Sequence, residues 1–266
     1  MELYRVVQAA KKFLSTTYQL FFGVDFTARW VKMEIKIGIA KINKYAMAEC
    51  GDSVEIAERP SGGISAILAD GQGSGKSAKI TSSLVVNKAA ALIADGARDG
   101  AVARAVHDYL YVVKDGKVSS TLTLISADLD TQTVVFSRNS NCPVILKHQY
   151  GVDVYDEEIS SIGVHKRMKP LMYQIPLEVG MLLVSYTDGI QAAGRKRSKS
   201  MNFDVIQKLI VENSAEDATF IAESILEYAL ELDDYRPSDD MTVVVMGICD
   251  TESVHNIQRM SVSFPC

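Results

Sequence analysis

The chain has 266 residues, of which 47% are hydrophobic and 23% charged, enough apolar material for one sizeable globular domain with an extension. Its net charge of -5 provides no excess of Lys and Arg for neutralising phosphates, which argues against a nucleic-acid partner. The four cysteines form no CxxC pair, so a zinc site is disfavoured and a reduced, cytoplasmic protein is expected. No apolar run approaches the ~18 residues of a membrane helix, so we expect no membrane insertion.

The N-terminal residues 3–21 place apolar side chains at helical spacing, and Gly23 can end that helix. We therefore expect residues 1–30 to form an N-terminal amphipathic helical extension. The stretch FLSTTYQLFFG lacks a small-residue cleavage site, so we do not expect a signal peptide. The apolar face of the helix can pack on its own domain, form a dimer seam or dock on a partner, and the sequence leaves these alternatives open.

Strand patterns begin at about residue 32. Residues 33–39 alternate between apolar and other side chains, which predicts a strand with one buried face. SVEIAERPSGGISAILAD, residues 53–70, predicts a hairpin whose turn is formed by residues 60–63. Its second strand is nearly all apolar or small, which predicts a central, buried position.

Two helices are expected next, over residues 77–94 and 99–113, with Asp99 as the N-cap of the second. Three β-branched runs follow (SSTLTLISADL, QTVVFSRN and CPVILKHQ), and they predict an antiparallel meander. MLLVSYTDG, residues 181–189, is another buried strand that ends at Asp188.

A polar loop to about residue 202 includes the basic run 195–199, which we interpret as solvated, and residues 195–200 as a candidate mobile flap. Two further helices are expected over residues 203–213 and 215–232, with a capping box formed by Ser214 and Asp217. The last strand covers residues 241–248.

This order of strands and helix pairs predicts an α+β fold. Neither βαβ alternation nor an all-β pattern fits it, whereas two packed antiparallel sheets with helix pairs outside do. We expect a four-layer α-β-β-α sandwich over residues 31–250. The C-terminal tail, residues 251–266, carries no readable signal.

The stretch ILADGQGSGKSAK, residues 67–79, is close to a phosphate-binding loop. The pattern G-x-x-x-x-G-K-[ST] places its first glycine at position 70, where this chain has Asp70. A carboxylate there would repel the phosphates that such a loop binds. A nucleotide-binding switch through Gly75, Lys76 and Ser77 stays open as the weakest of three functional hypotheses.

Acidic residues adjoin four apolar strands: Asp52, Asp70, Asp188 and Asp239, which is followed by Asp240. Strand ends in a sandwich can meet at one edge, and clustered carboxylates are tolerated when cations lie between them. Such oxygen ligands select Mg²⁺ or Mn²⁺, and two such ions can activate water and bind a phosphoryl group. The alternative for each aspartate is an ordinary turn or helix cap.

The segments GDS, ILADGQGSG, SYTDGI and SDDMTVVVMGI, in this order, resemble the metal-dependent serine/threonine phosphatases of the protein phosphatase 2C superfamily. The chain is most similar to the bacterial SpoIIE-like branch, over about residues 31–250. The resemblance implies an α-β-β-α sandwich that holds two Mn²⁺ or Mg²⁺ ions. It also implies a role in bacterial signalling, such as sigma-factor regulation in sporulation or stress.

The resemblance implies a role for each acid. Asp52 binds one ion, Asp70 bridges both ions, and the backbone carbonyl of Gly71 binds the ion that it shares with Asp52. Asp188 and Asp239 hold the other ion. Asp239 is chosen over Asp240 because the ligand in the family stands two residues before the Met-Thr or Met-Ser pair.

The chain departs from the eukaryotic pattern, which has His after Asp-Gly where this chain has Gln72. None of the four histidines adjoins a motif, so the resemblance assigns leaving-group protonation to metal-bound water. The phosphate-binding Arg of the eukaryotic enzymes has no evident match. Gly73 and Gly75 then serve the turn, Ser77 or its neighbour caps the helix, and Lys76 is solvated.

The leading hypothesis is therefore a phosphatase acting on phosphoserine or phosphothreonine of a regulatory protein, such as an anti-sigma-factor antagonist or a stressosome component. The second is a catalytically inactive scaffold or binding module of the same fold. Intact acids at all four positions favour the enzyme.

Overall fold

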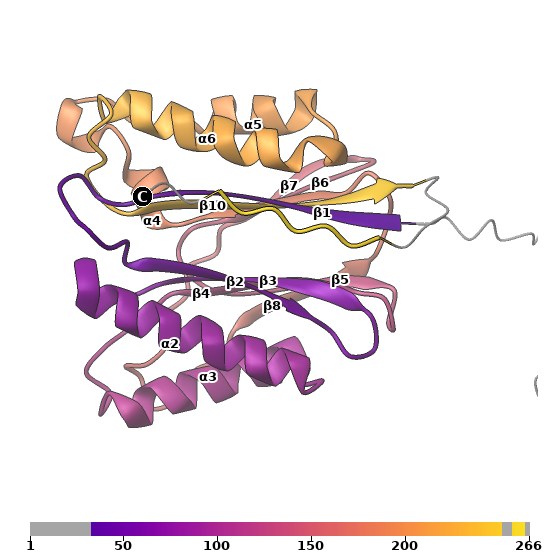
Figure 1. Cartoon of the computed structure of the whole chain (residues 1–266), viewed down its shortest axis with the longest axis horizontal. Coiled ribbons are helices and arrows are strands. Elements are labelled where there is room, and N and C mark those ends of the chain that lie inside the picture. Colours follow the sequence, from indigo (N-terminus) through magenta and orange to yellow (C-terminus); the bar gives the residue numbers. More distant parts are fainter. Residues whose placement is uncertain (1–32, 252–256, 264–266) are drawn as a thin grey trace, which may run out of the picture. The chain divides into compact units, whose positions relative to one another are not determined.

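Two five-stranded antiparallel sheets carry the fold, in a computed structural model that describes residues 33–251 and 257–263 (Figure 1). Met33–Asp250 forms one compact unit. The predicted helix over residues 3–21 and the extension over residues 1–30 lie outside the described residues. Residues 257–263 of the expected tail contain neither helix nor strand.

The first sheet joins the first and last strands of the unit. Its order is β1 (Met33–Ile42), β10 (Met241–Asp250), β9 (Leu182–Tyr186), β6 (Val144–His148) and β7 (Gly151–Tyr155). The second sheet has the order β2 (Asp52–Glu58), β3 (Gly63–Asp70), β4 (Leu122–Asp128), β5 (Thr133–Asn139) and β8 (Leu171–Pro176).

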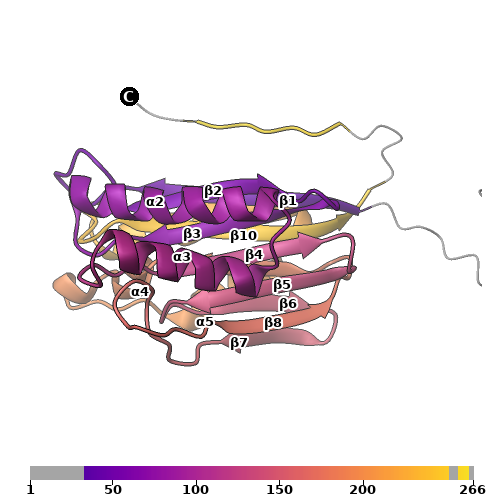
Figure 2. The same cartoon turned by 90° about the horizontal axis from the view of Figure 1, so that it is seen from below.

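A pair of helices covers the outer face of each sheet. Helices α2 (Gly75–Ala94) and α3 (Asp99–Val113) lie over the second sheet, which Figure 2 shows from the helix side. Helices α5 (Phe203–Glu212) and α6 (Ala218–Leu232) cover the first sheet in Figure 1. The predicted α+β sandwich of four layers, α-β-β-α, is confirmed. None of the helices described has the length and apolar character needed to cross a membrane.

Strand β3 explains why a continuous apolar run is needed at the centre of the sandwich. Ala66 and Leu68 pack into the core between the sheets, whereas Ile67 and Ala69 pack under the helices. Both faces of the strand are therefore buried, and the polar alternation of a half-exposed strand disappears.

The predicted meander is wrong in its third strand. β4 and β5 pair with each other, but β6 pairs with β7 and β9 in the other sheet. The fully buried Arg138 stabilises the crossing, because its guanidinium donates to the carbonyl oxygens of Ser140 and Cys142 at 2.8 and 3.3 Å. An apolar run records that a strand is buried but not which sheet it joins.

Two predicted helix starts also need correction. α2 begins at Gly75 after Ser74, so Ser77 is not its cap. The N-cap of α3 is Arg98, and the Asp99 carboxylate instead pairs with Arg59 at 3.2 Å. The capping box of Ser214 and Asp217 is confirmed, at the 3₁₀ turn η2 (Ala215–Asp217) that leads into α6.

The chain also contains elements that the sequence analysis did not predict. β7 and β8 are exposed edge strands in the stretch between residues 150 and 180. The short helix α4 (Asp188–Ala192) and the 3₁₀ turn η1 (Arg195–Arg197) follow β9. These elements are short and bury little apolar surface, so their hydrophobic pattern is weak.

Candidate active site

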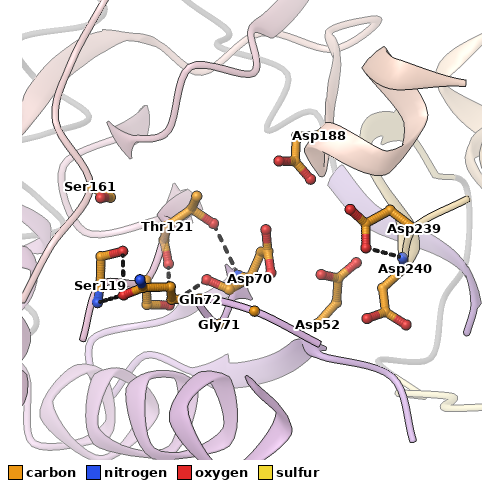
Figure 3. Close-up of a pocket in the computed structure, with 12 residues that line it drawn as sticks. Asp52, Asp70, Gly71, Gln72, Ser119, Thr121, Ser161, Asp188, Asp239 and Asp240 are labelled. Atoms are coloured by element: carbon orange, nitrogen blue, oxygen red, sulfur yellow. Dashed lines mark hydrogen bonds between the residues drawn. The ribbon is translucent and has the colours of Figure 1, made fainter. Parts of the chain in front are cut away.

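The four predicted acids meet at one end of the sandwich. Asp52 and Asp70 are direct partners in the ladder of β2 and β3. Asp188 follows β9 and Asp239 precedes β10, and those two strands are neighbours in the other sheet. With Gly71 they line a cavity of about 300 Å³, to which both sheets contribute carboxylates (Figure 3).

Asp52 is the most buried acid of the cluster, with 1% of its surface exposed. Its Oδ2 accepts hydrogen bonds from the hydroxyls of Thr187 and Thr242 at 2.8 and 2.6 Å. Its Oδ1 has no hydrogen-bond partner among the described residues. Burial is the main cause that raises the pKa of Asp52 to about 6. A buried carboxylate oxygen without a donor is expected to bind a cation.

Asp70 lies where the other carboxylates surround it. Burial raises its pKa to about 9, and the negative charges of Asp52, Asp188 and Asp239 add to the shift. The pKa of Asp188 is raised by burial and then by Asp239. The cluster therefore resists ionisation until protons or cations compensate its charge.

The backbone of Asp70 is held by the segment that precedes β4. Its N–H donates to Thr121 Oγ1 at 3.0 Å, and its carbonyl accepts from the Thr121 N–H at 2.8 Å and from Ser120 Oγ at 2.7 Å. Gln72 Oε1 accepts from the N–H of Ser119 at 2.8 Å. The residue at the histidine position of the resemblance thus binds a neighbouring loop.

Gly71 allows helix α2 to approach the cluster. A Cβ at this position would lie 2.1 Å from the carbonyl oxygen of Ala78, so any larger residue would push the helix away. Gly71 is therefore needed for the packing of α2 beside Asp70. Lys76, the lysine of the rejected phosphate loop, is exposed and does not line the cavity.

Adjacent aspartates have different surroundings at the start of β10. The Asp240 carboxylate accepts from the backbone N–H groups of Lys44 and Gly51, both at 2.9 Å, and is buried. The Asp239 side chain is 45% exposed and lies 3.7 Å from the Lys44 ammonium. Figure 3 shows Asp239 turned toward the cavity and the Asp240 carboxylate turned away from it. Asp239 is therefore the one free to bind a ligand.

The donor set fits a hard divalent cation. In the described part of the chain, no three His, Cys, Asp or Glu side chains converge closely enough to hold one ion by themselves. Mg²⁺ needs no such cage, because it keeps several waters and binds through one or two carboxylates. The unpartnered oxygen of Asp52 and the neighbouring Asp70 provide such a pair.

Several site residues were not predicted from the sequence. Ser119, Ser120, Thr121 and Ser161 line the cavity. Thr187 and Thr242 hold Asp52 in place, and the signal for them was available, since Thr187 directly precedes Asp188 and Thr242 is three residues after Asp239. No comparable signal marks residues 119–121 and 161, because their place depends on the crossing loops.

A family model described as stage II sporulation protein E (SpoIIE) matches residues 60–248. Stage II sporulation protein E of Priestia megaterium is 24% identical over 212 residues, which are 79% of this chain and 36% of that protein. The chain thus spans about a third of the length of this curated relative.

Solved structures of similar fold include the PP2C phosphatase domain, with a fragment of the regulatory domain, of SpoIIE from Bacillus subtilis. It is 23% identical, with a TM-score of 0.72, over 83% of this chain and 65% of that one. The catalytic domain of the serine/threonine protein phosphatase PstP, in complex with two manganese ions, is 16% identical. Its TM-score is 0.64, over 82% of this chain and all of that one.

Proposed function

We propose that Met33–Asp250 is a metal-dependent phosphoprotein phosphatase domain. The premise is that this chain belongs to the stage II sporulation protein E (SpoIIE) family. Its reaction is hydrolysis of phosphoserine or phosphothreonine. The observation that carries the proposal is the buried Oδ1 of Asp52, which lacks a partner among the described residues and faces further carboxylates in one cavity.

The acids of the cavity would together hold two Mn²⁺ or Mg²⁺ ions. Asp52, Asp70 and the carbonyl of Gly71 would hold one ion, and Asp70, Asp188 and Asp239 would hold the other, with waters completing both sets of ligands. Bound there, the ions supply an activated water and neutralise charge on the phosphoryl group. A neighbour of the same fold that carries two manganese ions supports this assignment.

The polar residues around the acids have supporting roles. Thr187 and Thr242 fix the orientation of Asp52 through their hydroxyls. Ser119 and Ser161 line the same cavity; the Ser119 hydroxyl donates to Gln72 Oε1 at 3.2 Å, and the Ser161 hydroxyl can donate to a phosphoryl oxygen. No described histidine lines the cavity, so solvent or bound water supplies the proton for the leaving group.

The substrate that we propose is a phosphorylated regulatory protein, such as an anti-sigma-factor antagonist or a stressosome component. The SpoIIE family supports a sporulation or stress-response setting. One neighbour of the same fold is a structure from the bacterial stressosome.

The direct test is hydrolysis of p-nitrophenyl phosphate with Mn²⁺, with Mg²⁺ and with excess EDTA. Asp188→Asn and Asp239→Asn should each lower turnover at least about 100-fold, because each removes a charged metal ligand. The exposed Asp130, in the turn between β4 and β5, gives the matched control Asp130→Asn, which should keep full turnover. Full activity in both site variants would reject the assignment.

The second candidate is an inactive scaffold of the same fold. The four acids and the threonines around Asp52 favour the enzyme, since a scaffold has no use for an unpaired buried carboxylate oxygen. Titration calorimetry with Mn²⁺ separates the two candidates. The enzyme should give heat of Mn²⁺ binding that Asp188→Asn abolishes, whereas a scaffold that binds no metal should give no such heat.

A further inference from the structure

A second cavity lies beside the acidic one. It has a volume of about 330 Å³ and is formed by the loop between β1 and β2, the turn η1, and the loop between α6 and β10. The two cavities are contiguous along the chain, because Ser238 lines the second and Asp239 lines the first. Lys44 lines the second cavity while its ammonium lies 3.7 Å from Asp239. We call this second cavity the basic pocket.

Hydrogen bonds to the backbone fix the walls of the basic pocket. The buried Asp233 accepts from the N–H of Gly194 at 2.8 Å and from the N–H of Ser238 at 2.6 Å, so it ties η1 to the loop before β10. The N–H of Tyr45 donates to the carbonyl of Pro237 at 2.9 Å, which adds the third loop. The pocket is thus preformed, which limits the entropy lost on binding.

Four cationic side chains line the basic pocket, and two of them are already paired. Arg197 pairs with Asp234 at 3.3 Å, and Lys44 pairs with Asp239. Among the described residues, Lys196 and Arg236 form no ion pair.

Neither unpaired cation forms an ion pair among the described residues, although the charge of Arg236 is one of the causes that lower the pKa of Asp234. Lys196 donates to the carbonyl of Ser238 at 3.3 Å, and the Arg236 guanidinium lies over the ring of Tyr45 at 5.6 Å from its centroid. Their positive charge therefore remains available to an anion.

We propose that the basic pocket binds a carboxylate side chain of the protein substrate that lies near its phosphorylated residue. The proposal rests on the proposed function, because it assigns a specificity pocket to that site. A carboxylate between Lys196 and Arg236 would complete two ion pairs, and a short acidic side chain fits the volume.

The overall charge strengthens this argument. At a net charge of -5, the protein as a whole does not attract an acidic partner, so the attraction must be local. The aspartates of the adjoining cavity need cations, and with those ions bound both sites accept an anion. A substrate with a phosphoryl group and a nearby carboxylate then places one anion in each site.

The test compares two phosphoserine peptides that differ only in the three positions on either side of the phosphoserine. The acidic peptide has Asp and Glu at these positions, and the neutral peptide has Asn and Gln. The whole chain is assayed with Mn²⁺ at low salt, where charge effects are least screened. We expect kcat/KM to be about fivefold higher for the acidic peptide, the effect of two partly exposed ion pairs. Lys196→Gln/Arg236→Gln should reduce this ratio to within about twofold of one.

The matched control is Arg104→Gln/Lys117→Gln, which removes the same charges from exposed positions on α3 and the loop after it and should keep the preference. Equal rates for the two peptides, or a preference that survives Lys196→Gln/Arg236→Gln, would overturn the proposal. If the wild type hydrolyses neither peptide, the proposed function fails on its own. Binding in the basic pocket is then tested by NMR titration with the unphosphorylated acidic peptide. Chemical-shift changes at Tyr45 and Arg236 would support the proposal, and their absence would reject it.

Discussion

At the scale of single residues, Asp239 and Asp240 show how adjacent identical side chains acquire different functions. The Asp240 carboxylate binds two backbone N–H groups of the β1–β2 loop, whereas Asp239 remains half-exposed at the cavity. The sequence SDDMT contains nothing that separates them. Only the resemblance to a family favoured Asp239, and its assignment as a ligand stays a proposal.

This difference predicts unequal effects of the two aspartates on stability. Asp240→Ala leaves the N–H groups of Lys44 and Gly51 without their acceptor, so it should lower the free energy of unfolding by about 1–3 kcal/mol. Asp239→Ala should change it by no more than about 0.5 kcal/mol in EDTA, because its contact with Lys44 is a solvent-exposed ion pair. Urea denaturation measures both, and an equal loss for the two variants would contradict the assignment.

At the scale of elements, sequence patterns predicted the structure where apolar surface is large. The hairpin of β2 and β3 and the four long helices follow their predicted ranges closely. The pattern failed where placement depends on distant partners, as for β6, which joins the other sheet with help from the buried Arg138. β7 and β8 were missed because they are short edge strands that bury little apolar surface.

One lysine of β6 adds hydrogen bonds to the apolar packing of helix α5 on the first sheet. Lys147 of β6 donates from its Nζ to the carbonyl oxygens of Ile210, Val211 and Asn213 at 3.1, 2.9 and 2.6 Å. These carbonyls belong to the C-terminal end of the helix and its continuation, where a positive charge is favourable.

We therefore expect Lys147→Met to lower the free energy of unfolding by about 1–2 kcal/mol and to increase amide exchange in α5 before other helices. Lys208→Met is the matched control on the exposed face of α5, where the lysine side chain is 72% exposed. Hydrogen exchange followed by mass spectrometry gives the readout. Unchanged exchange in α5 would show that the helix does not depend on this contact.

At the scale of the whole molecule, the candidate site exists only where the two sheets meet. One sheet supplies Asp52 and Asp70 and the other supplies Asp188 and Asp239. The sequence predicted these four because each adjoins a recognisable strand. It could not predict Ser161 or residues 119–121, because irregular segments bring them to the cavity and no periodicity marks such segments.

The acidic cluster predicts how pH affects the stability of the metal-free protein. The pKa of Asp70 is raised to about 9 and that of Asp52 to about 6, so the folded state holds protons that the unfolded state releases near pH 4. The contribution of these two acids to stability in EDTA is therefore fully present below about pH 4 and is lost as the pH rises toward about 9. Bound cations remove this loss.

We expect Mg²⁺ to raise the melting temperature more at pH 8 than at pH 6, relative to EDTA at the same pH. Differential scanning fluorimetry measures the four conditions, and Asp188→Asn should reduce the increment at both pH values. An increment that is equal at the two pH values would contradict the raised pKa values of the cluster.

The pairing of β1 with β10 has a consequence for synthesis on the ribosome. Of the strands described, β1 pairs with β10 alone, and the register sets Met33 opposite Asp250. Of the strands described, β1 is translated first and cannot pair until β10 has been synthesised. Until then the nascent chain carries an unpaired strand edge. Because Asp239 lies two residues before β10, a chain that stops before this point lacks both its closing strand and a proposed metal ligand. The proposed metal site can therefore form only after β10 has been synthesised.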